Sequence, residues 1–462
     1  MIVCKFGGTS VGSAAAIRRL AGIVRARHER GERPLVVVSA LSGVTDALVT
    51  LVRSTAVPEP AAALQAELGA LVARHAAVAA ELPGTDEALA WVRESAALLG
   101  RELERFLETT VPEPERDLAL AHGELWSSRL IAAALAAEGL PAAWVDVRPL
   151  LATDDRFGQA TPDQAELTAR TRAAVLPQLD GPAARIPVTQ GFVGSAPDGR
   201  TTTLGRGGSD FSAALLGAAL DAERVEIWTD VNGLMTADPR IVPEARTLDV
   251  VSYEEAAELA TFGAKVLHPA TALPLANRGI PIVVLNSMRP EETGSTIALV
   301  SVLRQEGASP IRSIAWKKNV TVINIRTPRL LGTFGVLRRI FEAFERHEIV
   351  VDVLASSEVS VSLTVDGTSR LDVLKRDLAR LGEVTVTPER AIVSVVGIGM
   401  RDTPGLAARI FAAVAPANVE MTSQGASAIN LTFVVRQDDG PDIVRRLHRE
   451  FFGTTLAAGA GA

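Results

Sequence analysis

Short apolar runs alternate with longer Ala- and Leu-rich segments from residue 2 to about residue 286. The apolar runs are rich in β-branched residues and lie at 2–6, 35–39, 144–147, 186–190, 225–229 and 282–285. Strands that are buried on both faces of a parallel sheet are typically such continuous apolar runs. The pattern therefore predicts an α/β domain with a largely parallel sheet. Residues 59–110 contain no such run, and we expect them to form a helical insertion that packs on this domain.

The last third of the chain contains an internal repeat with a constant offset. Corresponding positions include Thr333 and Thr403, Ile340 and Ile410, Ser357 and Ser427, and Leu363 and Phe433. In each copy a strand, at 320–325 or 392–396, precedes a helix that should begin near Thr333 or Thr403, and two β-rich runs follow. Thr403 is expected to be the N-cap of the second helix, because Pro404 suits the first helical position. The distance from one copy to the next is too long for a solenoid, so we expect two small βαββ-type domains.

Residues 287–310 separate these two regions. They mix Pro, Gly, Ser, Glu and Arg around one apolar run at 297–303, which is typical of a closing strand followed by a linker. The expected organisation is one large domain over 1–300, a linker over 301–312, and two repeats over 313–385 and 386–462.

Composition and charge exclude several classes of protein. Of the 462 residues, 47% are hydrophobic and 22% are charged, as in ordinary globular proteins. The net charge of −7 and the aromatic content of 4% argue against a nucleic-acid partner. No apolar run approaches the ~18 residues of a membrane span, and no basic leader is present, so we expect a cytoplasmic protein without a membrane partner. The single cysteine, Cys4, is expected in the core, and no Cys/His cluster has metal-binding spacing.

A glycine-rich segment, Lys5 to Gly12, lies between the first predicted strand and a helix predicted at 14–25. Glycines allow backbone N–H groups to approach an anion closely, and a helix N-terminus adds partial positive charge. In a Walker A loop the lysine follows the glycines, whereas here Lys5 precedes them. The segment therefore predicts a phosphate-binding loop in a fold other than the P-loop fold.

A second glycine-rich loop, Thr201 to Asp210, follows the strand predicted at 186–190 and precedes a helix predicted at 211–219. Its hydroxyl and glycine residues expose backbone donors, and Arg206 has the planar guanidinium that suits a carboxylate or a phosphate. Two anion-binding loops imply two anionic ligands.

The chain resembles the aspartate kinases of the amino-acid kinase family over nearly its whole length. The motifs that carry the resemblance are KFGGTSVG at 5–12, VSALSGVT at 38–45, HGEL at 122–125, TTLGRGGSD at 202–210, WTDVNGLMTADPR at 228–240 and FGAKVLHP at 262–269. The resemblance implies an amino-acid-kinase-type sheet sandwiched by helices, followed by two ferredoxin-like βαββαβ ACT domains. It also implies a monofunctional enzyme, without a homoserine dehydrogenase after the second repeat. Such an enzyme transfers phosphate from ATP to L-aspartate, the first step of lysine, threonine and methionine biosynthesis.

The resemblance assigns site residues position by position. The residues expected in catalysis are Lys5, Arg206 and Asp210. L-Aspartate is expected to contact Ser39, Thr45, Glu124, Arg206, Gly207, Gly208 and Ser209. The ATP site is expected to contain Lys5, Phe6, Gly7, Gly8, Thr229, Asp230, Met235, Arg240, Lys265 and Val266. Mg²⁺ is expected to be held mainly by the nucleotide phosphates, without a metal site made by the protein alone. The family usually has a tyrosine at the position of Met235, so weaker binding of the adenine is expected there.

The implied reaction needs no general base. The acceptor carboxylate has a pKa of about 4 and is ionised at neutral pH, so the barrier lies in joining two anions and neutralising the transferred phosphoryl group. Arg206 suits a bidentate contact with the α-carboxylate, and Glu124 can accept from the α-ammonium. His122 is therefore expected to make a structural hydrogen bond and to play no part in catalysis.

The two repeats resemble ACT domains, which bind amino acids at interfaces between paired copies. The segment SSEVSV at 356–361 resembles the effector strand of lysine-sensitive aspartate kinases. The expected effector residues are Leu330, Thr333, Val351, Asp352, Ser357 and Glu358. Asp352 and Glu358 suit a cationic amino acid, so lysine is the favoured inhibitor. A homo-oligomer, at least a dimer, is expected to form through the ACT domains, and an ACT pair that only dimerises the enzyme is the alternative.

Two other functions compete with phosphate transfer to aspartate. A catalytically weak amino-acid sensor would explain Met235, although Lys5, Glu124, Arg206 and Asp230 are all present. Another amino-acid kinase, acting on glutamate or a nucleotide, would explain neither the tandem repeats nor the helical insertion. Aspartate phosphorylation is therefore the leading hypothesis.

Overall fold

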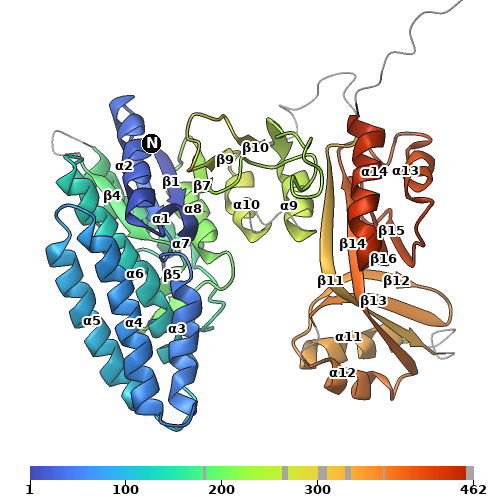
Figure 1. Cartoon of the computed structure of the whole chain (residues 1–462), viewed down its shortest axis with the longest axis horizontal. Helices are drawn as coiled ribbons and strands as arrows, with labels where there is room; N and C mark the ends of the chain where they lie inside the picture. The colour runs from blue at the N-terminus through green and yellow to red at the C-terminus, as the bar shows by residue number, and fades with distance from the viewer. Residues whose placement is uncertain (181–183, 263–268, 300–309, 328–333, 368–369, 454–462) are drawn as a thin grey trace, which may run out of the picture. The chain divides into compact units, whose positions relative to one another are not determined.

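The computed structural model describes residues 1–180, 184–262, 269–299, 310–327, 334–367 and 370–453 (Figure 1). The chain divides into two compact units. The first contains residues 1–234, 249–253 and 266–304, and the second contains residues 235–248, 254–265 and 305–462. Residues 235–248 and 254–262 thus pack with the C-terminal unit, although they precede residue 300.

The first unit is built on an eight-stranded sheet with the order β3-β4-β2-β1-β7-β9-β10-β8. Its strands are β1 (Ile2–Phe6), β2 (Pro34–Val38), β3 (Ala142–Trp144), β4 (Ile186–Gln190), β7 (Val225–Thr229), β8 (Val250–Ser252), β9 (Ile282–Asn286) and β10 (Ser295–Ala298). Every neighbouring pair is parallel except β9 and β10. The predicted α/β domain with a largely parallel sheet is therefore confirmed.

One strand lies earlier in the chain than the apolar pattern indicates. The prediction places a strand at 144–147, whereas β3 ends at Trp144. After Trp144, the N–H of Val145 still donates to the carbonyl of Val188 at 2.9 Å, but the N–H of Val147 donates to the side-chain oxygen of Gln190. The prediction was wrong here because, at this edge of the sheet, the side chain of Gln190 accepts the hydrogen bond from Val147 in place of a backbone carbonyl.

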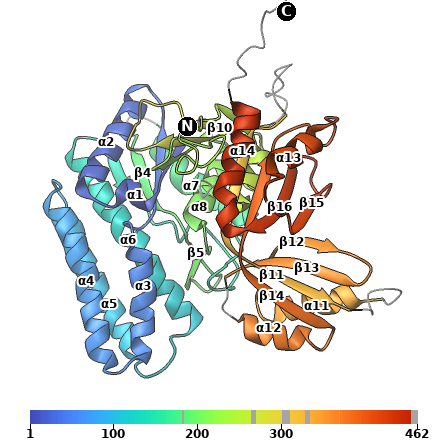
Figure 2. The same ribbon diagram turned by 45° about the vertical axis from the view of Figure 1, so that its right-hand side comes forward.

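Helices cover the sheet of the first unit. They are α1 (Gly8–Val11), α2 (Ala14–Glu29), α3 (Val44–Arg53), α4 (Pro60–Ala80), α5 (Asp86–Glu104), α6 (Glu113–Ala137), α7 (Gln164–Leu179), α8 (Gly208–Ala219) and α10 (Pro269–Ala276). The hairpin of α4 and α5 lies beside α3 and α6 in both views (Figures 1 and 2). Buried leucines of this hairpin, such as Leu64 and Leu99, belong to the same apolar core as β1 and β2. Residues 59–110 are therefore helical and pack on the sheet domain, as the sequence indicated.

The pleat of β1 decides which side chains reach α8. Ile2, Cys4 and Phe6 point into the core shared with α2 and α6. Because side chains alternate along a strand, Lys5 points to the opposite face. There it forms an ion pair with Asp210 of α8.

The second unit contains a six-stranded antiparallel sheet with the order β12-β13-β11-β14-β16-β15. The strands are β11 (Ser313–Arg326), β12 (Val351–Ser356), β13 (Ser360–Asp366), β14 (Glu383–Val396), β15 (Met421–Gln424) and β16 (Asn430–Arg436). The helices are α9 (Tyr253–Thr261), α11 (Val336–Arg346), α12 (Leu371–Leu378), α13 (Leu406–Val414) and α14 (Gly440–Phe452). Tyr253, the first residue of α9, belongs to the first unit. Each repeat has its own apolar core, one around Ile340 and one around Ile410.

Two long strands, β11 and β14, are shared by the repeats. Residues 320–326 of β11 pair with β13 of the first repeat, whereas residues 313–317 pair with 392–396 of β14, which pair in turn with β16. Ile314 accordingly packs in the core of the second repeat, beside Val393 and Phe433. The strand at 313–317 thus completes the sheet of the second repeat, while the sequence-based range assigns it to the first.

The starts of three helices differ from the predictions. Helix α13 begins at Leu406, after Gly405 with φ 77°, and the hydroxyl of Thr403 donates to the carbonyl of Gly399 at 2.8 Å. The expectation that Thr403 caps this helix was therefore wrong, because Thr403 closes the preceding turn instead. The first-repeat helix, α11, begins at Val336, and Thr333 lies outside the described residues. Helix α8 begins at Gly208 and not at 211. Within the described ranges, we find no helix long and apolar enough to cross a membrane.

Candidate active site

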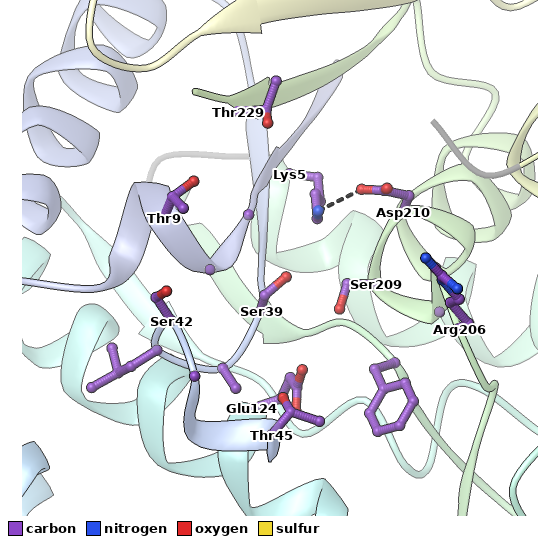
Figure 3. Close-up of a pocket in the computed structure, with 18 of the residues that line it drawn as sticks. Lys5, Thr9, Ser39, Ser42, Thr45, Glu124, Arg206, Ser209, Asp210 and Thr229 are labelled. Carbon is purple, nitrogen blue, oxygen red and sulfur yellow. Dashed lines mark ion pairs between the residues drawn. The ribbon is translucent and has the colours of Figure 1, made fainter. Parts of the chain in front are cut away.

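A pocket of about 490 Å³ opens in the first unit at the carboxyl ends of β1, β2 and β7 (Figure 3). This is where open α/β sheets usually bind ligands. Both glycine-rich loops contribute to its lining, together with the turn after β2 and the middle of α6. The residues assigned by resemblance that line it are Lys5, Gly7, Gly8, Ser39, Thr45, Glu124, Arg206, Gly207, Gly208, Ser209, Asp210, Thr229 and Asp230.

Three other residues expected in the ATP site, Phe6, Met235 and Arg240, do not line this pocket. Phe6 is fully buried and stacks on Trp228 with ring centroids 6.0 Å apart. Met235 and Arg240 belong to the second unit, and the exposed guanidinium of Arg240 pairs with Asp238 at 2.6 Å. Lys265 and Val266 lie outside the described residues.

The pocket also contains residues that the sequence analysis did not assign. They are Thr9, Ala40, Leu41, Ser42, Gly43, Asp46, Phe192 and Gly205. All but Asp46 and Phe192 lie inside the motifs that carry the resemblance, so the motifs could have indicated them. Phe192 follows β4 and reaches the site only because β4 lies next to β2.

Lys5 is the buried cation of the pocket. Only 7% of its surface is exposed, and its ammonium pairs with the carboxylate of Asp210 (Figure 3). The turn that follows is tightly packed, because a Cβ on Gly8 would lie 3.2 Å from the carbonyl oxygen of Ala40. Lys5 is therefore held at a fixed point beside a loop whose backbone can approach a ligand closely.

Two helices begin at the pocket wall. Helix α3 begins at Val44 after Gly43, and α8 begins at Gly208 after Gly207, both glycines having φ 76°. This left-handed conformation strains residues with a Cβ, and it directs the first N–H groups of each helix toward the pocket lining. Arg206 is exposed, and no carboxylate of the described residues pairs with its guanidinium. Backbone donors and one free guanidinium thus make this wall a site for anions.

Glu124 is the buried carboxyl group of the pocket. It lies on α6 with 3% of its surface exposed, and its Oε2 has no hydrogen-bond partner in the described structure. Burial raises the pKa of Glu124 to about 8, against the opposing effects of the Ala40 N–H and the Lys5 charge. In the ligand-free pocket Glu124 is thus mainly protonated at neutral pH, and an incoming ammonium group would favour its ionised form.

Asp117 lies two turns before Glu124 on α6 and fixes the loop that carries Arg206. Its Oδ2 accepts from the N–H of Gly158 at 2.8 Å and from the N–H of Thr203 at 2.7 Å. Thr203 ends β6 (Thr201–Thr203), which pairs with β5 (Val193–Ser195) just before the loop. Asp117 is 1% exposed, and burial raises its pKa although both N–H groups lower it. One helix therefore holds the Glu124 carboxyl and anchors the Arg206 loop.

His122 has a structural role, as expected. Its Nδ1 lies 2.8 Å from the carbonyl oxygen of Leu118, and its ring packs edge-on against Trp126. Burial lowers the pKa of His122 to about 4, so the ring is neutral at physiological pH. Among the described residues, the pocket lining includes neither histidine nor cysteine, and no three His, Cys, Asp or Glu groups are arranged to hold a metal ion.

The expected effector residues lie on the first repeat. Val351 and Asp352 are on β12, and Ser357 and Glu358 are exposed in the turn before β13. Leu330 and Thr333 lie outside the described residues. Asp352 already has a cationic partner, because the ammonium of Lys317 lies 2.9 Å from its Oδ2. The same ammonium lies 2.8 Å from Oδ2 of Asp366. The carboxylate that is expected to bind an effector is therefore already paired with a lysine of the same repeat.

Comparison with known proteins identifies the family. Residues 1–286 match the model of the amino acid kinase family, and residues 393–451 match that of the ACT domain. The chain belongs to the amino acid kinase family. It is 37% identical to lysine-sensitive aspartokinase 3 of Escherichia coli, over 98% of this chain and 99% of that protein. Within the family it is an aspartokinase, a phosphotransferase with a carboxyl group as acceptor.

Further relatives agree with this assignment. Aspartokinase 1, chloroplastic, of Arabidopsis thaliana is 33% identical over 97% of this chain and 80% of that protein. The chain spans about half the length of the bifunctional aspartokinase/homoserine dehydrogenases of plants that it matches. The crystal structure of E. coli aspartokinase III with aspartate and ADP superposes with a TM-score of 0.83, covering 98% of this chain and all of that chain.

The buried carboxyl group of Glu124 should make stability depend on pH. Between the ordinary value of 4.5 and about 8, the folded state keeps a proton that the unfolded chain releases, so stability falls as pH rises through this range. Glu124→Gln removes this titration. We expect the variant to be more stable than the wild type at pH 8.5, by about 1–3 kcal/mol, with the difference vanishing near pH 4.5. Urea denaturation between pH 4.5 and 9 measures it.

Glu94→Gln is the matched control, because Glu94 is exposed on α5. It should leave the pH profile unchanged. Parallel profiles for Glu124→Gln and the wild type would contradict the raised pKa.

Asp117 should control acceptor binding through the Arg206 loop. Both N–H groups bond to a single oxygen, so Asn can keep these bonds, while Ala leaves two donors unsatisfied, one of them buried. We expect Asp117→Ala to raise the KM for the acceptor about 10–100-fold and to lower kcat by a smaller factor. Asp117→Asn should bring the KM most of the way back to the wild-type value. Steady-state kinetics, with melting curves of both variants, test this. Equal loss in both variants would show that charge matters and not the anchoring bonds.

Proposed function

We propose that this aspartokinase transfers the γ-phosphoryl group of ATP to the side-chain carboxylate of L-aspartate, giving 4-phospho-L-aspartate and ADP. The observation that carries the proposal is one pocket with two ends and a lysine between them. In the view of Figure 3, Glu124 and Thr45 lie at one end, Thr229 at the other, and the Lys5–Asp210 pair between them. The E. coli relative of known structure was crystallised with aspartate and ADP.

At the amino-acid end, a cationic group and an acidic group would bind the two charged backbone groups of aspartate. The unpaired guanidinium of Arg206 would bind the α-carboxylate, and the buried carboxyl of Glu124 would ionise on meeting the α-ammonium. The remaining contacts would come from Ser39, Thr45 and Ser209 and from the backbone of Gly207 and Gly208. This combination selects a zwitterion with a further carboxylate.

At the nucleotide end, the phosphates would lie against Gly7 and Gly8, within reach of Lys5, with Thr229 and Asp230 farther along the pocket. The roles of Met235, Arg240, Lys265 and Val266 stay predictions. Mg²⁺ fits here, since hard cations take carboxylate and phosphate oxygens and two carboxylates, of Asp210 and Asp230, line this part of the pocket. When bound, it would supply charge neutralisation for the phosphates.

The reaction would proceed by in-line attack of a carboxylate oxygen of aspartate on the γ-phosphorus. The bond from this phosphorus to the β,γ-bridging oxygen breaks, and ADP leaves. No proton is transferred, so the lack of a histidine in the described pocket lining is no obstacle. Lys5 stabilises the charge on the equatorial oxygens, and Asp210 keeps the Lys5 ammonium oriented before substrate binds.

We further propose that the product enters lysine, threonine and methionine biosynthesis and that lysine inhibits the enzyme at the first ACT repeat. The E. coli relative is lysine-sensitive, and its structure with lysine and aspartate superposes with a TM-score of 0.81 at 37% identity. The acid that would receive a cationic effector, Asp352, has 11% of its side chain exposed. Burial raises its pKa, and a cationic partner stabilises the ionised form.

Exposed apolar side chains on the first repeat support a homo-oligomer. They are Phe334, Leu337, Phe341, Val350, Leu354 and Val359, and Phe334 is completely exposed. Large exposed apolar side chains gathered on one small domain are typical of interfaces between proteins. We therefore propose that copies of the chain associate through this repeat.

Formation of aspartyl hydroxamate from aspartate, ATP, Mg²⁺ and hydroxylamine tests the activity. Lys5→Met should lower kcat by about 10²–10³-fold, because its charge acts on the transferred group. Arg206→Ala should mainly raise the KM for aspartate, about 10–100-fold. Arg200→Ala is the control, since Arg200 is exposed beside the same loop and pairs with Asp198. Absence of product from folded wild-type protein would refute the proposal, and the reverse kinetic pattern would exchange the two roles.

Lysine inhibition should depend on Lys317, because its ammonium already forms an ion pair with the carboxylate of Asp352. Lys317→Met frees this carboxylate, so we expect half-maximal inhibition at a lysine concentration about 3–10-fold lower. Lys318→Met, at the exposed neighbouring position, should change nothing, and Asp352→Asn should weaken inhibition. Inhibition curves in the same assay measure this. If Lys317→Met instead raises the lysine concentration at half-maximal inhibition, then Lys317 contributes to effector binding and does not compete with the effector for Asp352.

A further inference from the structure

Two buried serine hydroxyls meet beside the nucleotide end of the pocket. Ser10 belongs to α1, within the first glycine-rich segment, and Ser287 directly follows β9. Their Oγ atoms lie 2.7 Å apart, and the residues are 1% and 3% exposed. Both belong to the first unit, and neither lines the pocket. The reaction proposed above therefore gives these two side chains no part.

The serine pair joins the carboxyl ends of three neighbouring parallel strands. Strand β7 lies between β1 and β9 in the sheet. The hydroxyl of Ser10 lies 3.2 Å from the carbonyl oxygen of Trp228, and that of Ser287 lies 3.1 Å from the carbonyl oxygen of Thr229. The same carbonyls accept from the backbone N–H groups of Gly7, at 3.0 Å, and of Ser287, at 2.8 Å. The glycine-rich segment and the residues after β9 are thus both bonded to the end of β7.

The two hydroxyls have fewer hydrogen atoms than contacts. A serine hydroxyl carries one hydrogen, so the pair can donate two hydrogen bonds among the three contacts that it makes. A carbonyl that receives neither of them still accepts from the N–H of Gly7 or of Ser287. Loss of one hydroxyl therefore leaves neither carbonyl without a donor, and Ser→Ala at either position mainly removes the bond between the two segments.

Two further side chains from the same edge hold residues 229–234, which follow β7. The side-chain amide of Asn286, the last residue of β9, donates to Oδ1 of Asn232. The N–H of Leu234 donates to Oγ of Ser295, the first residue of β10, at 2.9 Å. This segment is therefore fixed along its length by β9 and β10, with Ser287 at its start.

We propose that Ser287 is a positioning residue for the nucleotide. Through Ser10 it would hold the phosphate-binding glycines in register with Thr229 and Asp230, which line the other side of the nucleotide end. A ligand bound by two segments that are distant in sequence is bound most tightly when their relative position is fixed in advance. The amino-acid end is built mainly on α6 and α8, whereas both hydroxyls bond to other elements. The inference rests on the proposed binding of ATP at this end.

Steady-state kinetics of the full chain in the hydroxamate assay test the position of the effect. We expect Ser287→Ala to raise the KM for ATP about 3–10-fold and to leave the KM for aspartate within about twofold. Ser54→Ala is the matched control, because Ser54 is 5% exposed and its hydroxyl donates to the carbonyl of Leu51 at the end of α3, at 2.7 Å. It should change neither KM. Equal increases of both KM values in Ser287→Ala would overturn the proposal.

A double-mutant cycle tests the bond between the serines. Ser10→Ala should raise the KM for ATP by a factor similar to that of Ser287→Ala, because either substitution removes the same bond. The double variant Ser10→Ala/Ser287→Ala should then be no worse than the single variants. A double variant whose effect equals the product of the two single effects would show that the serines act independently.

Calorimetric titration with ADP and Mg²⁺ separates nucleotide binding from phosphate transfer. The Kd for ADP should rise in Ser287→Ala by the same factor as the KM for ATP, with Ser10→Ala serving the same purpose if melting curves show that Ser287→Ala does not fold. An unchanged Kd in folded variants would refute the positioning role. Wild-type protein that binds ADP but forms no hydroxamate would refute the proposed reaction alone, because the effect of both serines on ADP binding would remain measurable.

Discussion

The buried ion pair of Lys5 and Asp210 is the interaction on which the active site depends. A lysine with 7% exposure at the end of a fully buried strand is costly unless a partner compensates its charge. Because side chains alternate along β1, Lys5 points toward α8. Helix α8 begins at Gly208, so Asp210 lies in its first turn and pairs with Lys5. The pairing of β1 with both β2 and β7 keeps Lys5 central in the sheet. One electrostatic requirement thus joins the two glycine-rich loops, which lie far apart in the sequence, in a single pocket.

Helix α6 supplies the second constraint, because it carries buried polar side chains through an apolar core, among them Asp117, His122 and Glu124. Asp117 and His122 are satisfied by backbone groups, so they stiffen the surroundings. Of these three, Glu124 alone keeps an oxygen without a partner, and burial raises its pKa to about 8. A buried polar group left unsatisfied in the empty protein is destabilising, and a ligand with a matching ammonium removes that penalty. In the proposed reaction, this one carboxyl group would therefore contribute to the specificity for an amino acid.

The sequence was most informative where structure is local. Continuous apolar runs predicted β1, β4 and β7 to the residue, because buried parallel strands need no periodicity beyond such a run. The glycine motifs indicated both predicted anion-binding loops, because a loop of this kind is also encoded by a short stretch of sequence. Features that depend on pairing between distant segments could not be predicted from the sequence. Residues 313–317 join the second repeat through pairing with a strand much later in the chain, at 392–396, and Phe192 enters the pocket through the strand order. The partner of Asp352 was missed because Asp352 lies on β12 and Lys317 on β11, and β13 separates these two strands in the sheet.

The two repeats show how one scaffold can carry opposite electrostatics. Their cores are built alike around Ile340 and Ile410, and their long strands run side by side in one sheet. In the first repeat the acids Asp352 and Asp366 compete for the ammonium of Lys317, so any cationic ligand must exchange with an internal cation. In the second repeat the equivalent positions, Thr422 and Arg436, lack acids. Because β11 and β14 pass through both halves of the sheet, a displacement of these strands in one repeat would be transmitted to the other.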